Sequence, residues 1–273
     1  GQMADVARRF GYGETKLRAE QSGKNTQEVN DLALAFNTMA DSLEQSEQRR
    51  QEFIANVSHE LKTPMTTIGG YVDGILDGTI PKDNEKHYLQ IVSSEVRRLS
   101  RLVRSMLDLS RLQAQGIDES RKTRFDLGDV MGDVLITFEQ KINARGLQVN
   151  VDLPEKPVWT KADRDAITQV VYNLLDNAIK FCPVGGNLGL ILEQDGQKAR
   201  LRIRNTGQTI PPEELPLLFD RFHKADKARS ADREGWGLGL YIAKTIIGAH
   251  GGEIWATSEN GVTEFTFTLP AVR

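Results

Sequence analysis

The apolar residues near the N-terminal end of this chain recur at alternating steps of three and four. Val29, Leu32, Phe36, Met39 and Leu43 form this first series. The spacing places them on one stripe of an α-helix and is typical of a coiled-coil seam. The seam predicts association between helices, and by itself it indicates no chemistry.

A second apolar series follows, shifted in phase from the first: Ile54, Val57, Leu61, Ile68, Val72 and Ile75. The shift between Leu43 and Ile54 is a stutter, which changes supercoiling locally. We interpret it as a joint that passes rotation from one helical module to the next. The alternative is an irregularity without a function.

Gly78 and Pro81 break this helix, and a third series predicts another one: Leu89, Val92, Val96, Leu99, Val103 and Met106. Two helices joined by a short turn form an antiparallel hairpin. A single hairpin cannot cover its own apolar stripe, so we expect two copies to pair into a dimeric four-helix bundle.

The pattern changes to mixed α/β after Gln115-Gly116. Asp126 is placed to cap a helix through about Ala144, and Asp195-Gly196 is a hairpin turn signal. These elements predict an α+β two-layer sandwich. The remaining expected elements are strands at Gln148–Asp152, Leu188–Leu192, Ala199–Arg204, Gly252–Ala256 and Thr263–Leu269, and helices at Ala166–Phe181, Pro212–Phe219 and Leu240–Ala249.

Bulk composition excludes some functions. The net charge of -3 is too small to favour nucleic acid or an anionic membrane surface as the main partner. The single cysteine, Cys182, excludes an internal disulfide and suits a reducing compartment. No stretch approaches the ~18 uninterrupted apolar residues of a membrane-spanning helix.

His59 is the first candidate for chemistry. It lies two positions from Val57, about 200° round the helix, so it is expected to face solvent. An exposed imidazole is a usable nucleophile near neutral pH, and Glu60 could hold the N–H of one ring nitrogen. For an isolated histidine, a solvated surface position is the commoner explanation.

A second candidate is the polar stripe of Asn173, Asn177 and Lys180. On a helix these residues fall within about 60° of each other. Amide oxygens suit a hard cation and the ammonium of Lys180 suits phosphates. Taken alone, such a stripe is more often a solvated helix face.

The third candidate is the glycine run Gly235-Trp236-Gly237-Leu238-Gly239, which opens the helix to Ala249. Glycines allow backbone N–H groups to approach phosphates, and a helix N-terminus favours anions. Polar residues precede the run and no Gly-Lys-Ser/Thr follows, so neither a Rossmann nor a Walker loop is indicated.

The string Ser58-His59-Glu60-Leu61-Lys62-Thr63-Pro64 resembles the phosphoacceptor box of sensor histidine kinases. The resemblance implies His59 as the phosphoacceptor and Glu60 as the polarising carboxylate. It also implies that Thr63 positions the water that dephosphorylates the partner.

The polar stripe resembles the asparagine box of the same kinases, and the glycine run resembles their second glycine box. Phe219-Asp-Arg-Phe222 matches the phenylalanine box, and 220–234 resembles the ATP lid. The resemblance implies ATP and Mg²⁺ as cofactors, with Asn177 as magnesium ligand and Asn173 beside it. The implied ATP-binding residues are Asn173, Asn177, Lys180, Phe181, Asn205, Gly207, Thr209, Gly235, Gly237, Leu238 and Gly239.

One box departs from the family pattern. Asn205-Thr206-Gly207-Gln208-Thr209 stands where the family has Asp-x-Gly-x-Gly. Asn205 can still accept a hydrogen bond from adenine through its carbonyl oxygen, without the charge. Thr209 lacks the backbone freedom of the second glycine.

The resemblance implies three domains: a partial HAMP linker at 1–45, a dimerisation and histidine phosphotransfer hairpin at 46–116, and a GHKL (Bergerat-type) catalytic and ATP-binding domain at 117–273. The expected function is autophosphorylation on His59, transfer to an aspartate of a response regulator, and phosphatase activity toward it. The chain is expected to be a homodimer and the cytoplasmic piece of a membrane receptor. The alternatives are a weakened kinase acting as a phosphatase or dimeric scaffold, and a GHKL ATPase of another class.

Overall fold

The computed structural model describes residues 2–20, 26–115, 118–224 and 235–272. The chain divides into two compact units, Gly1–Leu89 and Gln90–Arg273, and each is treated by itself below. Among the helices described, none has a stretch long and apolar enough to cross a membrane.

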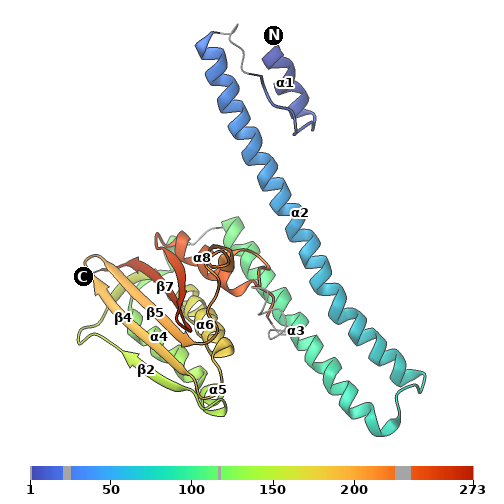
Figure 1. The fold of residues 1–273 in the computed structure, drawn as a ribbon, viewed down its shortest axis with the longest axis vertical. Coiled ribbons are helices and arrows are strands. Elements are labelled where there is room, and N and C mark those ends of the chain that lie inside the picture. The colour runs from blue at the N-terminus through green and yellow to red at the C-terminus, as the bar shows by residue number, and fades with distance from the viewer. Residues whose placement is uncertain (1, 21–25, 116–117, 225–234, 273) are drawn as a thin grey trace. The chain divides into compact units, whose positions relative to one another are not determined.

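The N-terminal unit is built from helices. It contains α1 (Gln2–Gly11), α2 (Gln27–Leu76) and the first residues of α3 (Lys82–Gln115). Figure 1 shows α2 as one uninterrupted helix. The stutter between Leu43 and Ile54 therefore does not break the helix, and neither does Pro64.

The turn after α2 forms where the glycine and proline predict it. Gly78 has a φ of +79°, which side chains with a Cβ rarely adopt, and the backbone N–H of Ile80 donates to Gly74 O at 2.8 Å. Across the turn, the rings of Tyr71 and Tyr88 lie with centroids 4.9 Å apart. The predicted helical hairpin is confirmed.

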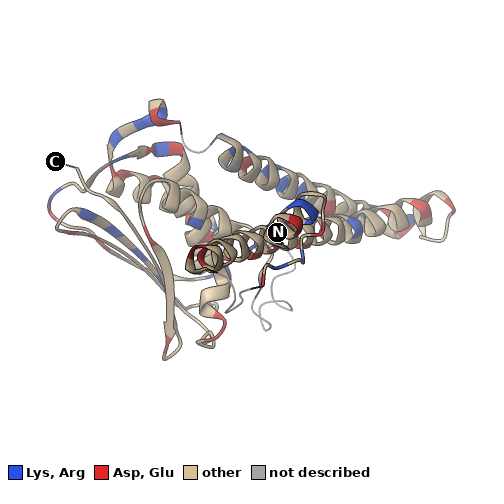
Figure 2. Ribbon diagram, turned by 90° about the horizontal axis from the view of Figure 1, so that it is seen from above, with Lys and Arg blue, Asp and Glu red and all other residues tan. Residues whose placement is uncertain are grey.

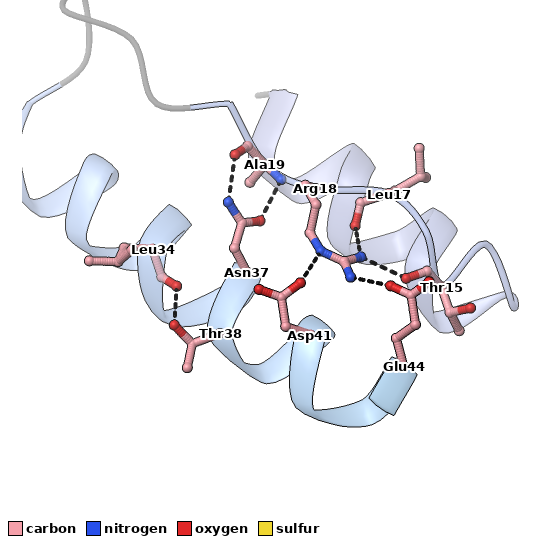
Figure 3. Close-up of polar contacts among 9 residues, drawn as sticks. All are labelled: Thr15, Leu17, Arg18, Ala19, Leu34, Asn37, Thr38, Asp41 and Glu44. Atoms are coloured by element: carbon pink, nitrogen blue, oxygen red, sulfur yellow. Dashed lines mark hydrogen bonds and ion pairs between the residues drawn. The ribbon is translucent and has the colours of Figure 1, made fainter. Parts of the chain in front are cut away.

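The segment after α1 is fastened to α2 by paired polar contacts (Figure 3). The side-chain amide of Asn37 accepts from the N–H of Ala19 at 2.8 Å and donates to its carbonyl at 2.9 Å. Arg18 donates to Asp41 at 2.8 Å and also pairs with Glu44. One face of α2 is therefore covered by its own chain.

The C-terminal unit contains the rest of α3 and a mixed α+β domain. Its main sheet has the strand order β2-β4-β5-β7-β6, in which only β2 and β4 run parallel, and β1 pairs with β3 in a separate two-stranded sheet. The strands are β1 (Lys122–Asp126), β2 (Gln148–Asp152), β3 (Trp159–Asp163), β4 (Asn187–Asp195), β5 (Lys198–Thr206), β6 (Ile254–Glu259) and β7 (Val262–Pro270). The helical elements are η1 (Glu119–Arg121), α4 (Leu127–Thr137), α5 (Glu139–Ala144), α6 (Arg164–Phe181), η2 (Leu215–Phe219) and α8 (Gly239–Ala249).

Helices α4, α6 and α8 form the second layer of this domain (Figure 1). Along β5, Leu201 and Ile203 are fully buried toward the helices. The alternating residues on the other face are charged: Arg200 and Arg202 both pair with Glu193 on β4, at 3.1 and 2.9 Å, and Figure 2 shows residues of both signs on the sheet. This alternation confirms the predicted two-layer α+β sandwich.

Local details differ from the expectations. The helix capped by Asp126 does not continue to Ala144, because Phe138 interrupts it with a φ of -99° and a ψ of 1°. The ring of Phe138 is buried and packs on Tyr172 with centroids 4.7 Å apart. The β1–β3 pair and the parallel β2–β4 pair were not expected, and 212–219 forms only the 3₁₀ helix η2.

Candidate functional site

His59 faces solvent on α2, as its position relative to the apolar series predicts. Its side chain is 78% exposed, and Nδ1 lies 3.7 Å from Oε1 of Glu60. That distance is too long for a hydrogen bond but short enough for electrostatic attraction. The carboxylate therefore lies beside Nδ1 and leaves Nε2 open for reaction.

Thr63 lies one helical turn after His59 on the same exposed side. Its hydroxyl lies 3.4 Å from the carbonyl oxygen of His59, at the long end of hydrogen-bond range. The hydroxyl is therefore held only weakly by its own helix.

Helix α6 presents the asparagine stripe because its opposite face is buried. Val170, Leu174 and Ala178 are fully buried, whereas Asn173 and Asn177 are partly exposed. The helix begins at a side-chain cap, in which Oδ1 of Asp163 accepts from two backbone N–H groups of the first turn at 3.1 and 3.2 Å. The predicted separation of polar and apolar faces is confirmed.

The asparagine box and the second glycine box lie in contact. The amide nitrogen of Asn173 donates to the carbonyl of Gly239 at 3.1 Å. A Cβ added at Gly239 would lie 3.6 Å from Cγ of Asn173, so the two boxes meet at van der Waals distance. The amide oxygen Oδ1 of Asn173 is not used in that bond.

Gly237 is required by its backbone and its surroundings. Its φ is +68°, and a Cβ there would lie 2.7 Å from backbone atoms of Phe222 and His223. The N–H of Phe222 donates to Gly237 O at 3.0 Å, which joins the glycine run to the phenylalanine box. Leu238 is buried and Gly235 is partly exposed.

The variant box around Asn205 approaches the C-terminal end of the asparagine helix. Asn205 is 3% exposed, and its amide nitrogen donates to Thr206 O at 3.0 Å, which leaves its oxygen as an acceptor. Gly207 approaches the C-terminal end of α6 so closely that a Cβ would lie 3.0 Å from Phe181 O.

Thr209 has a structural role that its residue type did not reveal. Its hydroxyl accepts a 2.9 Å hydrogen bond from the N–H of Gly261 in the β6–β7 turn, and the N–H of Gly207 donates to Gly261 O at 2.8 Å. The hydroxyl therefore gives this variant box an anchor that a second glycine could not provide.

Arg145 is a positioning residue that the sequence did not reveal. Its guanidinium donates to the carbonyls of Lys180 and Cys182, at 3.2 and 2.6 Å, at the C-terminal end of α6. These contacts join residues 35 and 37 positions apart, and no local pattern marks them.

The side chains at this site suit magnesium and phosphate. Within the described residues no cluster of three or more His, Cys, Asp or Glu side chains is found. Two of the polar side chains on the exposed stripe of α6 are amides, whose oxygens can coordinate a cation. Asn177 and Oδ1 of Asn173 supply such oxygens on the exposed stripe, and hard cations accept them. Most of the predicted ATP lid, residues 225–234, lies outside the described residues.

Models of known protein families match the two regions that hold His59 and the candidate nucleotide site. Residues 49–115 match the model of the His Kinase A (phospho-acceptor) domain. Residues 162–273 match the model of the histidine kinase-, DNA gyrase B-, and HSP90-like ATPase. His59 lies in the first match, and the asparagine and glycine boxes lie in the second.

Individual relatives cover most of the chain. Sensor protein SrrB of Staphylococcus aureus is 38% identical over 226 residues, which are 82% of this chain and 38% of that protein. The structure of histidine kinase AdeS from Acinetobacter baumannii has a TM-score of 0.65 at 30% identity, covering 79% of this chain and 98% of that one. The structure of histidine kinase ThkA in complex with response regulator TrrA has a TM-score of 0.66 at 27% identity. The match covers 85% of this chain and 66% of that one.

The fold and the two boxes define a protein that carries both a phosphoacceptor helix and an ATPase domain. The chain belongs to the sensor histidine kinase family of protein-histidine kinases. It spans 38% of the length of its curated SrrB relative.

Proposed function

We propose that this chain binds ATP with Mg²⁺ in its C-terminal unit and phosphorylates its own His59. The observation that carries the proposal is the 78% exposed imidazole of His59 with a carboxylate 3.7 Å from Nδ1. An imidazole whose second nitrogen is open is the nucleophile that phosphoryl transfer to histidine requires.

In the proposed step, Nε2 of His59 forms a bond to the γ-phosphorus while the bond from that phosphorus to the bridging oxygen of ADP breaks. The ring proton on Nδ1 is stabilised by, or passed to, Glu60. Asn173, Asn177 and Lys180 orient the phosphates, so the residues contribute mainly positioning and charge stabilisation. Magnesium, when bound, neutralises phosphate charge.

The phosphoryl group is proposed to pass to an aspartate of a response regulator. ThkA forms a complex with the response regulator TrrA, and its structure matches 85% of the present chain. We also propose that Thr63 positions water when the same surface dephosphorylates the regulator, because its hydroxyl is held only by a 3.4 Å contact.

We propose the domain boundaries 1–45, 46–116 and 117–273, with the first segment a partial HAMP linker. The α1 helix and the connector fastened to α2 support that boundary. The seam residues Leu32 and Met39, which are 58% and 55% exposed, support a homodimer. We further propose that the parent protein is a membrane receptor and that this part of it is cytoplasmic.

Incubation with γ-labelled ATP and magnesium tests the central step. The chain is expected to take up label that is lost in acid and kept in alkali, whereas His59→Gln takes up none and still binds ATP. His87→Gln, an exposed histidine on α3, is the matched control and keeps its label. Acid-labile phosphate persisting in His59→Gln would refute the assignment.

The main alternative is a weakened kinase that acts as a phosphatase or scaffold, because Asn205 replaces the family aspartate. Asn205→Asp restores the charge at the same size. Calorimetry with ATP distinguishes the two functions. Millimolar or weaker binding that Asn205→Asp strengthens about tenfold or more favours the weakened enzyme, since charge-assisted hydrogen bonds are roughly twice as strong as neutral ones.

A further inference from the structure

His250 is a buried histidine at the C-terminal end of α8, and it is 7% exposed. Its Nε2 lies 3.0 Å from the backbone nitrogen of Asp163, and its Nδ1 lies 2.9 Å from the carbonyl oxygen of Ile246. The backbone N–H of Asp163 is a donor, so Nε2 accepts, and Nδ1 must then carry the proton. Both contacts are satisfied by one neutral tautomer.

The bond to Asp163 connects His250 to the nucleotide site. Asp163 is the last residue of β3, and its side chain caps the first turn of α6. Helix α6 in turn presents Asn173 and Asn177. Because Asn173 in the middle of α6 contacts Gly239 at the start of α8, and His250 at the end of α8 holds the start of α6, both ends of α8 are joined to α6.

Protonation of the ring would remove one of these joints. In the imidazolium both nitrogens are donors, so Nε2–H would face the N–H of Asp163 and that backbone group would lose its acceptor. Burial is the main cause that holds the pKa of His250 below its ordinary value, and Lys122 lowers it further. The Ile246 carbonyl, Asp163 and Glu119 oppose that shift, and Arg121 pairs with the Asp163 carboxylate at 3.2 Å.

We propose that His250 is a positioning residue of the nucleotide site, which in its neutral form holds the start of α6 against the end of α8 and releases it in mild acid. The proposal rests on the ATP site proposed above. A group whose pKa is lowered by folding stabilises the fold above its ordinary pKa, and this contribution is lost as the pH falls. The affected range therefore lies below the ordinary histidine value of 6.5.

The test measures ATP affinity of the full chain from about pH 7.5 to about pH 5.0 in three forms. His250→Gln offers an uncharged oxygen to the N–H of Asp163 and cannot titrate. The wild-type chain is expected to lose about fivefold more affinity on acidification than His250→Gln, whose own loss reports protonation of the nucleotide phosphates. His87→Gln is the control and keeps the wild-type loss.

Hydrogen exchange on the same samples separates this inference from the proposed function. Exchange of the peptide that spans 160–166 is expected to accelerate in acid, relative to the intrinsic rate, in the wild-type chain and not in His250→Gln. If the chain binds no ATP at any pH, the proposed function fails, while the exchange result still decides the role of His250. Equal acid dependence of exchange in wild type and His250→Gln overturns the proposal, and where ATP binds, equal acid dependence of its affinity does so too.

Discussion

Helices α2 and α6 both present candidate functional side chains on an exposed stripe, yet their apolar residues are buried to very different extents. On α6, Leu174 and Ile179 are fully buried by the rest of its own unit. On α2, only Ala33, Ala40 and Pro64 are buried among the residues described, and Leu32 remains 58% exposed. The C-terminal unit therefore contains its own core, whereas the N-terminal unit presents a surface that a second helix can cover.

This difference in burial suits the two functions proposed for the helices. In the proposed function, phosphates and a cation are held by side chains in fixed positions, and the buried face of α6 would fix them. In the same proposal, His59 meets an ATP site and then a partner protein, and an exposed helix surface permits both. Each prediction below tests this contrast, beginning with the largest expected effect.

Truncation of a buried leucine should destabilise the C-terminal unit strongly. Leu174→Ala removes a fully buried side chain and is expected to cost about 2–5 kcal/mol of unfolding free energy. All three tryptophans, Trp159, Trp236 and Trp255, lie in that unit, so tryptophan fluorescence during urea unfolding reports it alone. Leu32→Ala is the control and should leave this transition unchanged; equal losses in both variants would contradict the contrast.

A charge on the seam should weaken dimerisation, whereas the same charge elsewhere on α2 should not. Leu32 belongs to the predicted seam, and Leu34, two positions on, lies about 200° round the helix. They are 58% and 55% exposed, so exposure alone does not distinguish them. Leu32→Glu is expected to raise the dimer dissociation constant about tenfold or more, and Leu34→Glu to change it little. Light scattering over a dilution series measures both dissociation constants. If Leu34→Glu dissociated the dimer and Leu32→Glu did not, the predicted seam would not be the dimer interface.

The elements that the sequence predicted depend on local signals. The three–four spacing predicted α2 and α3. The Asp126 cap predicted the start of α4, and Asp195-Gly196 predicted the hairpin of β4 and β5. The asparagine face of α6 followed from its periodicity, as did the exposure of His59.

The missing features depend on contacts between distant residues. Strands β1 and β3 pair Lys122 with Asp163, and their polar sequences show no clean alternation. At the break between α4 and α5, the ring of Phe138 packs on Tyr172, a contact that no local pattern indicates. No local pattern singles out His250, because nothing near it in the sequence indicates a bond to a residue 87 positions away.

Removal of the Asn37 side chain should loosen the connector without unfolding α2. Asn37→Ala deletes both hydrogen bonds to Ala19, each worth about 1 kcal/mol. Hydrogen exchange of the peptide over 15–20 is expected to rise about tenfold. Thr38→Ala is a neighbouring control, since its hydroxyl bonds only to Leu34 O on the same helix (Figure 3). Unchanged exchange in Asn37→Ala would show that the ion pairs of Arg18 hold the connector by themselves.

The smallest effect is expected at Thr209, where the C-terminal unit uses an exposed hydroxyl in place of the family glycine. Thr209→Val keeps the shape and removes the acceptor of the Gly261 N–H. Water can replace that acceptor because the position is exposed, so the expected loss is only about 0.5–1 kcal/mol in urea unfolding followed by tryptophan fluorescence. Thr209→Ser retains the hydroxyl and should restore most of it. Thr209→Gly also lacks the hydroxyl and adds chain entropy to the unfolded state, so it should be no more stable than Thr209→Val. If Thr209→Gly matched the wild-type chain, the hydroxyl would not be what compensates for the missing glycine.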